Sequence, residues 1–188
     1  MEVGGFQGQI QELTINFALV QLHISKDNHN TKYANLLSSS NNVQYLMGDE
    51  NEGFIKIGLT DSVAVSCPES IEYWHIIIAI KIENMNGLIA TIPGDSFNKY
   101  ILLLLEEGKV KLKFYQGITF TAIESMEHIL IGEWFEIVIS HDGKNMYMQI
   151  NGNEKRYVPL ALSKTMITSG TDIFLGAIRD DMRVNDFI

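Results

Sequence analysis

Apolar and polar side chains alternate along two stretches in the middle of the chain. Residues 110–115 read Val-Lys-Leu-Lys-Phe-Tyr, and residues 135–140 read Phe-Glu-Ile-Val-Ile-Ser. Because neighbouring residues of a β-strand point to opposite faces, each stretch predicts a strand with one buried face. A turn adjoins each stretch, at 106–109 and at 141–144, where Asp142-Gly143 favours the positive φ angles of a tight hairpin. The pattern therefore predicts antiparallel hairpins.

Strand signals recur along the rest of the chain, whereas helix signals are scarce. Short apolar runs separated by Gly, Asn and Asp turns cover 8–24, 54–58, 74–83, 87–92 and 172–176. We therefore predict an all-β fold, an antiparallel two-sheet β-sandwich of the jelly-roll type. Its core is expected to include Phe54, Ile78, Leu103, Val110 or Leu112, Trp134, Ile137, Met148 and Leu175.

Composition and charge narrow the class of partner. The chain has 188 residues, of which 46% are hydrophobic, so it can bury a sizeable core. Its formal net charge of −9 argues against nucleic acid and suits calcium or a basic partner, although acidity for solubility is the alternative. No apolar run approaches the ~18 residues of a membrane span. The single cysteine, Cys67, cannot form an internal disulfide.

Several segments, in order, carry a resemblance to a known family. Gly132-Glu133-Trp134 followed by alternating apolar residues and a strand ending in Asn151-Gly152 is the most informative of them. With the other segments it resembles the laminin G-like (concanavalin A-like) jelly rolls and their thrombospondin and collagen N-terminal relatives. Phe135 stands where the family usually has His, and Ala177 where it has a second Gly. The other matching segments are 53–57, 76–82 with 86–89, 100–114 and 173–176.

The two ends of the chain suggest a domain organisation. Family members usually close with a strand that should begin near 186–188, and residues 5–16 look like that strand, with Gln9 in the usual Cys position. We expect 1–16 to be the closing strand of a preceding or permuted domain, 17–42 a linker or surface loop, and 43–188 the laminin G-like domain. Neighbouring domains in a longer chain are expected as well. We further expect residues 8–16 to insert beside the first strand, near 54–57, within one chain or swapped between two.

Catalytic patterns are poor, which predicts that the chain is not an enzyme. There is no Gly-x-Ser-x-Gly, no His-Glu-x-x-His and no phosphate-binding glycine loop. His75 is interpreted as a packed or edge residue, and His141 as a solvated turn residue. Glu106 and Glu107 are neighbours in a strand pattern, so they cannot flank one glycosidic bond together.

The resemblance implies a calcium site at one rim of the sandwich. The candidate ligands are Asp180 and Asp181, helped by Asp95 or Asn98, because Ca²⁺ prefers several hard oxygen ligands. Lys99 beside Asn98 would oppose a cation, and solvated loop acids are the alternative interpretation.

The resemblance also implies a function. It predicts a non-catalytic, extracellular or secreted adhesion module of the matrix type, which binds a protein or a glycan through one rim. One alternative is a lectin-like, carbohydrate-binding domain attached to a glycosidase or a toxin, and another is an architectural spacer. Tyr115, Tyr147 and Tyr157 could stack on a sugar or a partner, although single exposed tyrosines are ordinary.

Overall fold

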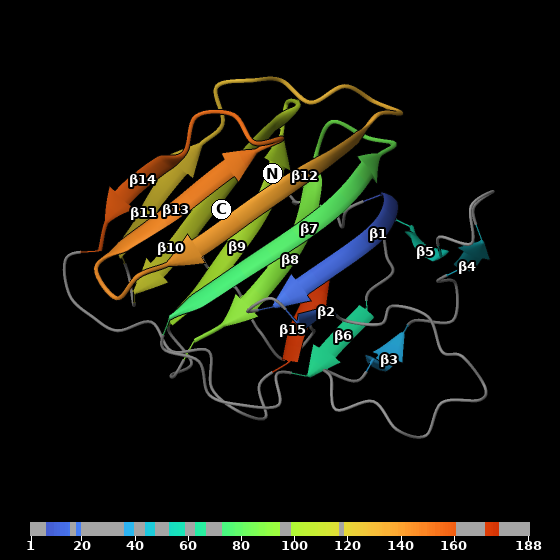
Figure 1. The fold of residues 1–188 in the computed structure, drawn as a ribbon, viewed down its shortest axis with the longest axis horizontal. Coiled ribbons are helices and arrows are strands. Elements are labelled where there is room, and N and C mark those ends of the chain that lie inside the picture. Colours follow the sequence, from blue (N-terminus) through green and yellow to red (C-terminus); the bar gives the residue numbers. More distant parts are fainter. Residues whose placement is uncertain are drawn as a thin grey trace.

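The computed structural model describes ten segments of the chain, and all their regular structure is β-strand (Figure 1). These segments are residues 7–15, 18–19, 36–39, 44–47, 53–58, 63–66, 73–94, 99–116, 119–160 and 172–176. Within them no helix is long and apolar enough to cross a membrane.

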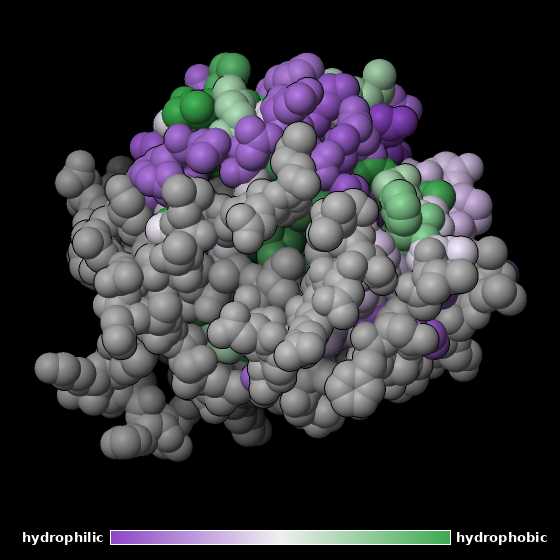
Figure 2. Space-filling view, turned by 180° about the vertical axis from the view of Figure 1, so that it is seen from behind, coloured by the Kyte–Doolittle hydropathy of each residue, from purple (hydrophilic) through white to green (hydrophobic). Residues whose placement is uncertain are grey.

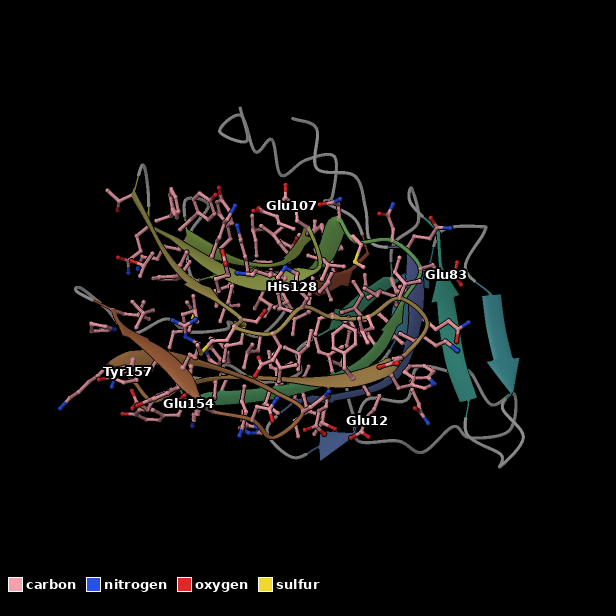
Figure 3. All side chains as sticks on the ribbon, turned by 90° about the horizontal axis from the view of Figure 1, so that it is seen from above. Glu12, Glu83, Glu107, His128, Glu154 and Tyr157 are labelled. Carbon is pink, nitrogen blue, oxygen red and sulfur yellow. The ribbon has the colours of Figure 1, made fainter. Side chains whose placement is uncertain are left out.

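The strands form two antiparallel sheets that pack face to face, as predicted (Figures 1 and 3). The first sheet has eight strands in the order β14-β13-β12-β7-β1-β5-β4, with β2 beside β1. Their bounds are β1 (Gly8–Ile15), β2 (Ala18–Leu19), β4 (Gln44–Met47), β5 (Gly53–Ile57), β7 (Trp74–Ile82), β12 (Trp134–His141), β13 (Asn145–Ile150) and β14 (Arg156–Pro159).

The second sheet has seven strands in the order β11-β10-β9-β8-β15-β6-β3. Their bounds are β3 (Leu36–Ser39), β6 (Val63–Ser66), β8 (Gly87–Pro93), β9 (Lys99–Glu106), β10 (Lys109–Gln116), β11 (Thr119–Glu124) and β15 (Asp172–Leu175). Both predicted hairpins are confirmed, since β9 pairs with β10 and β12 pairs with β13.

The core lies between the sheets and follows the predicted alternation. In β7 the side chains from Trp74 to Ile82 alternate strictly between buried and half-buried. The side chain of Phe54 lies outside the described residues. The predicted core residues that are buried are Ile78, Leu103, Val110, Leu112, Ile137, Met148 and Leu175.

Trp134 corrects this prediction, because its side chain is 40% exposed. It begins β12 opposite Lys81, and the next residue, Phe135, points into the core. A strand's period of two therefore turns Trp134 outward. The buried tryptophan is Trp74, which is 2% exposed.

The predicted pairing of the N-terminal strand is confirmed. β1 lies between β5 and β7, with Gly8 opposite Ile57 on one side and Ile82 on the other. It therefore supplies an inner strand of the first sheet. The expected boundaries at 16 and 42 remain predictions, and β3 lies inside the stretch expected to be a linker or loop.

The loops and turns of the sandwich lie at its two ends. At the Trp134 end lie the turns at 83–86, 106–108 and 151–153 and the loop at 125–133, which joins β11 of one sheet to β12 of the other. Figure 3 shows this loop, which carries His128, running between the two layers. The β12–β13 turn lies at the opposite end, the His141 end.

Candidate functional site

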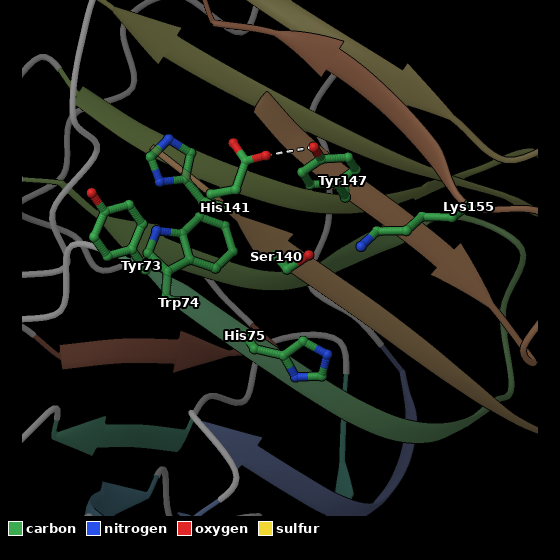
Figure 4. A pocket seen from close by; sticks show the side chains of 8 residues that line it. Tyr73, Trp74, His75, Ser140, His141, Tyr147 and Lys155 are labelled. Atoms are coloured by element: carbon green, nitrogen blue, oxygen red, sulfur yellow. Dashed lines mark hydrogen bonds between the residues drawn. The ribbon is translucent and has the colours of Figure 1, made fainter. Parts of the chain in front are cut away.

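An open hollow of about 520 Å³ lies on the first sheet near the His141 end (Figure 4). Strands β7, β12 and β13 form its floor, because the outward-facing residues His75, Ser140 and Tyr147 lie opposite one another in the strand register. The hollow is lined by Tyr73, Trp74, His75, Ser140, His141, Asp142, Tyr147 and Lys155.

Asp142 fixes one wall of the hollow. Its Oδ1 accepts hydrogen bonds from the backbone N–H groups of Lys144 (2.9 Å) and Asn145 (2.7 Å), which closes the β12–β13 turn. Its Oδ2 accepts the hydroxyl of Tyr147 at 2.5 Å and the side-chain amide of Asn145 at 3.3 Å. Four donors leave this carboxylate little remaining capacity, so it positions Tyr147 rather than contacting a ligand itself.

This hydrogen bond sets the protonation state of both partners. The Tyr147 hydroxyl, followed by the backbone N–H groups of Asn145 and Lys144, holds the pKa of Asp142 well below its usual range. The Asp142 carboxylate in turn raises the pKa of Tyr147. Tyr147 therefore stays a neutral phenol at physiological pH, and its ring is held by its own hydroxyl.

Two further tyrosines lie near this end of the first sheet, one beside Tyr147 and one over the β12–β13 turn. Tyr157 lies opposite it on β14, with the ring centroids 6.0 Å apart and the planes tilted by 41°. Tyr73 packs over Gly143, where a β-carbon would lie 2.8 Å from Cε1 of the ring. Gly143 also has φ +86°, so the turn needs glycine on both counts. Tyr73 and Tyr157 are 61% and 66% exposed.

Two polar groups in the hollow are not committed to other parts of the described chain. The ammonium of Lys155 lies 4.2 Å from the ring centroid of Tyr147 and makes no ion pair or hydrogen bond with described residues. The Ser140 hydroxyl likewise makes no hydrogen bond to them. The hollow thus offers aromatic rings, an ammonium donor and a hydroxyl, the mixture that fixes a small polar ligand.

His141 corrects the interpretation of this residue as a solvated turn. It is the last residue of β12 and is 3% exposed, because the strand alternation carries it inward. Its ring stacks on Trp74, with centroids 5.8 Å apart. The two rings underlie the hollow.

A second aromatic group lies on the outer face of the second sheet and differs from the hollow. We call it the aromatic row: Tyr100, Tyr115 and Phe120 lie opposite one another on β9, β10 and β11. Their rings stack face to face, at centroid distances of 4.6 Å and 5.4 Å. Tyr115 packs with Leu102 and Leu104 in a buried cluster. Tyr100 and Phe120 cover Tyr115 on both sides, so the row packs around Tyr115, while Phe120 at its edge is 59% exposed.

Charged pairs continue that outer face beyond the row. Lys111 bridges Glu106 (2.7 Å) and Glu124 (3.1 Å), and Lys113 also reaches Glu106 at 2.7 Å. Burial alone would raise the pKa of Glu106, but the hydrogen bonds from Lys111 and Lys113 lower it. These lysines are therefore already paired.

The calcium ligands predicted from sequence, Asp180, Asp181, Asp95 and Asn98, all lie outside the described residues. Within the described part of the chain, no group of three or more His, Cys, Asp or Glu side chains could hold a metal. The calcium site therefore stays a prediction.

Tyr147 and Tyr157 are candidates from the sequence, whereas Tyr73, Asp142 and Lys155 carry no such signal there. Opposite positions in a hairpin are readable from its turn, so Ser140 could have been placed beside Tyr147. The pairing of β7 with β12 could not be predicted in this way, because about sixty residues separate the two strands along the chain.

Comparison with known proteins identifies the fold. Domain 4 of an extracellular arabinanase from Geobacillus stearothermophilus, solved in complex with arabinotriose, matches with a TM-score of 0.57 and 14% identity, over 90% of this chain and 84% of that one. The binding domain of a botulinum neurotoxin of serotype D/C matches with a TM-score of 0.54 and 15% identity, over 92% of this chain and 47% of that one.

Domains LG4-5 of the mouse laminin alpha1 chain match with a TM-score of 0.53 and 18% identity, over 64% of this chain. This chain spans 31% of that laminin fragment. No curated protein sequence matches. The family model described as "Laminin G domain" matches residues 80–186, which is more than half of the chain. The chain therefore belongs to the laminin G domain family.

Proposed function

We propose that this chain is a non-catalytic, extracellular binding domain that holds a glycan in the hollow. One observation carries the proposal. Tyr73 and Tyr147 line the hollow together with an ammonium and a hydroxyl that make no ion pair or hydrogen bond with the described residues, and Tyr157 packs beside Tyr147. The family supports an extracellular location, because its domains are typically extracellular.

A sugar suits this mixture of groups better than a fully apolar ligand. A pyranose or furanose ring presents C–H groups on its faces and hydroxyls at its edge. Tyrosine offers a rigid apolar face with a polar tip, at low cost in side-chain entropy. Lys155 donates to a sugar oxygen, and Ser140 both donates and accepts. An open hollow of this kind takes one or two sugar units of a longer chain.

The arrangement does not suit hydrolysis. Ser140 and His75 lie opposite each other across β12 and β7. Ser140 nevertheless makes no hydrogen bond within the described structure, whereas an activated nucleophile needs one to its base. Asp142 is engaged with Tyr147 and the turn. This arrangement supports a binding role for these side chains.

The structural neighbours support a binding role at the level of the fold. One is a domain solved with arabinotriose, and another is the binding domain of a neurotoxin. A carbohydrate-binding function is also compatible with the alternative that this domain is attached to a glycosidase or a toxin.

A glycan array with matched variants tests the proposal. It should hold neutral and acidic glycans, arabino-oligosaccharides among them, and should be probed with the wild type, Tyr157→Ala and Phe120→Ala. Tyr157 and Phe120 are similarly exposed, at 66% and 59%, but lie on opposite sheets. Wild type and Phe120→Ala should bind the same glycans, and Tyr157→Ala should lose most of the signal. No binding by the wild type, or equal binding by Tyr157→Ala, would overturn the proposal.

The rim remains a second candidate for binding, with calcium at Asp180 and Asp181 and help from Asp95 or Asn98. The family resemblance supports protein adhesion through such a rim. It also supports neighbouring domains in a longer chain. Titration calorimetry should show a heat on adding Ca²⁺ that the double change Asp180→Asn, Asp181→Asn removes. Absence of thermal stabilisation at millimolar Ca²⁺ counts against this site.

A further inference from the structure

The loop between β11 and β12 displays large apolar side chains at the Trp134 end. Leu130 and Ile131 are 56% and 53% exposed, and Trp134 follows within three residues. We call these three residues the apolar tip. Figure 2 shows strongly hydrophobic atoms standing out at the upper edge of the molecule, among hydrophilic ones. Single exposed apolar side chains are common on protein surfaces, but a contiguous group of large ones marks a contact surface.

The backbone holds the tip in place. Ile129 is buried and donates its N–H to the carbonyl of Gly108 at 2.7 Å. Gly132, at φ +83°, donates to the carbonyl of Ile82 at 3.0 Å. The N–H of Glu133 donates to the carbonyl of Leu130 at 3.4 Å, which closes a turn over residues 130–133. Since the loop is anchored on both sides, Leu130 and Ile131 cannot fold back into the core without breaking these bonds.

Carboxylates are frequent at the Trp134 end. Glu83 and Glu107 come from the turns at 83–86 and 106–108. Glu127 and Glu133 come from the loop itself and are exposed. On the other side, Lys81 lies opposite Trp134. The charge at this end is therefore mainly negative.

We propose that the apolar tip docks on a lipid surface of zwitterionic, choline-bearing headgroups. Leu130 and Ile131 enter between the headgroups, where burial of their exposed surface is favourable. Trp134 lies at the base of the tip, at the interfacial depth that tryptophan prefers. The glutamates attract the outer choline cations and repel anionic lipids.

The size and shape of the tip favour lipid over a protein partner. A stable protein interface buries about 800 Å² on each side, with 20–30 residues taking part. Three protruding side chains are too few for that. They suffice for weak, reversible contact with a bilayer, which needs no complementary pocket.

Tryptophan fluorescence with defined vesicles tests the inference. Of the two tryptophans, Trp74 is buried and Trp134 is partly exposed, so the environment-sensitive signal comes from Trp134. Sugar-free phosphatidylcholine vesicles should shift the emission to shorter wavelength, and acyl-chain-brominated phosphatidylcholine should quench it. Adding phosphatidylserine should weaken binding. Because the vesicles carry no glycan, the result is independent of the proposed glycan site.

The double change Leu130→Ser, Ile131→Ser should reduce vesicle co-sedimentation at least about fivefold, with an unchanged circular dichroism spectrum. Tyr157→Ala and Phe120→Ser should bind vesicles like the wild type. Binding that survives the double change, or an absence of both shift and quenching, would overturn the inference. So would a dimer, seen by sedimentation velocity without lipid, that the double change dissociates, because the tip would then be a self-association surface.

Discussion

The hollow, with Tyr157 at its side, and the aromatic row both bring aromatic side chains together on the outer face of a sheet, yet they differ in what the rings touch. In the row, Tyr115 is sandwiched between Tyr100 and Phe120 and is only 9% exposed. In the hollow, the ring of Tyr147 is tilted against that of Tyr157. The Lys155 ammonium and the Ser140 hydroxyl lie beside Tyr147. Rings that cover one another contribute stability, whereas rings left open beside polar groups can contact a ligand.

The largest expected effect separates these two roles. Tyr115→Ala should lower the free energy of unfolding by roughly 2–4 kcal/mol, because it removes a buried ring stacked on both sides. Denaturant titration measures the loss. Glycan affinity should stay unchanged at a temperature where the variant is folded. A loss of affinity without a loss of stability would reverse the roles given to the two groups.

The turn under Tyr73 gives a sharper test. Gly143→Ala should cost roughly 1–2 kcal/mol from left-handed backbone strain. It should also weaken glycan binding, because the new methyl group displaces the Tyr73 ring. Gly152→Ala is the matched control, since Gly152 has φ +70° with nothing within 4 Å of an added β-carbon. If both variants lose the same affinity, strain alone explains the loss and Tyr73 has no part in binding.

The charged pairs beside the row should matter less. Glu106→Gln should cost under about 1 kcal/mol, because partly exposed ion pairs contribute little net stability. Since hydrogen bonds from Lys111 and Lys113 lower the pKa of Glu106, its contribution is present above the unfolded value of about 4.3 and is lost as pH falls. Thermal melts at low and high salt measure it. A large loss that persists at high salt would show a packing role for Glu106.

Asp142→Asn should change a titration more than it changes stability. The pKa of Tyr147, now raised by the carboxylate, should return toward its ordinary value of about 10, as seen by ultraviolet difference spectroscopy. Tyr147→Phe should remove that late-titrating phenol altogether. An unchanged tyrosine titration in Asp142→Asn would mean that the hydrogen bond does not hold Tyr147.

The same bond predicts two opposite pH dependences. The pKa of Asp142 is lower in the folded state, so its stabilisation is complete above about pH 4 and disappears in more acidic solution. The pKa of Tyr147 is higher in the folded state, so its stabilisation is complete below about pH 10 and disappears as pH rises through the folded value. Between these limits the Asp142–Tyr147 pair should keep one protonation state.

Sequence alone predicts the hairpins and much of the core, because a period of two states which residues share a face. The errors at Trp134 and His141 come from the ends of β12, where the boundary decides whether a residue belongs to the strand or the turn. Register within the 141–145 hairpin is readable from its turn. The hollow could not be predicted from the sequence. Its floor requires β7 to pair with β12, and its wall requires Tyr73 to pack over Gly143. Such contacts between distant segments leave no local pattern.

Isothermal titration calorimetry with the glycan that binds most strongly on the array tests directly whether the hollow is the glycan-binding site. The wild type, Tyr157→Ala and Phe120→Ala are compared, since both changes remove an exposed ring of the same class. The account predicts that Kd rises at least about tenfold in Tyr157→Ala, roughly 1.4 kcal/mol, and less than about twofold in Phe120→Ala. A Kd that is unchanged in Tyr157→Ala but raised tenfold in Phe120→Ala would contradict it, because the ligand would then bind the other sheet.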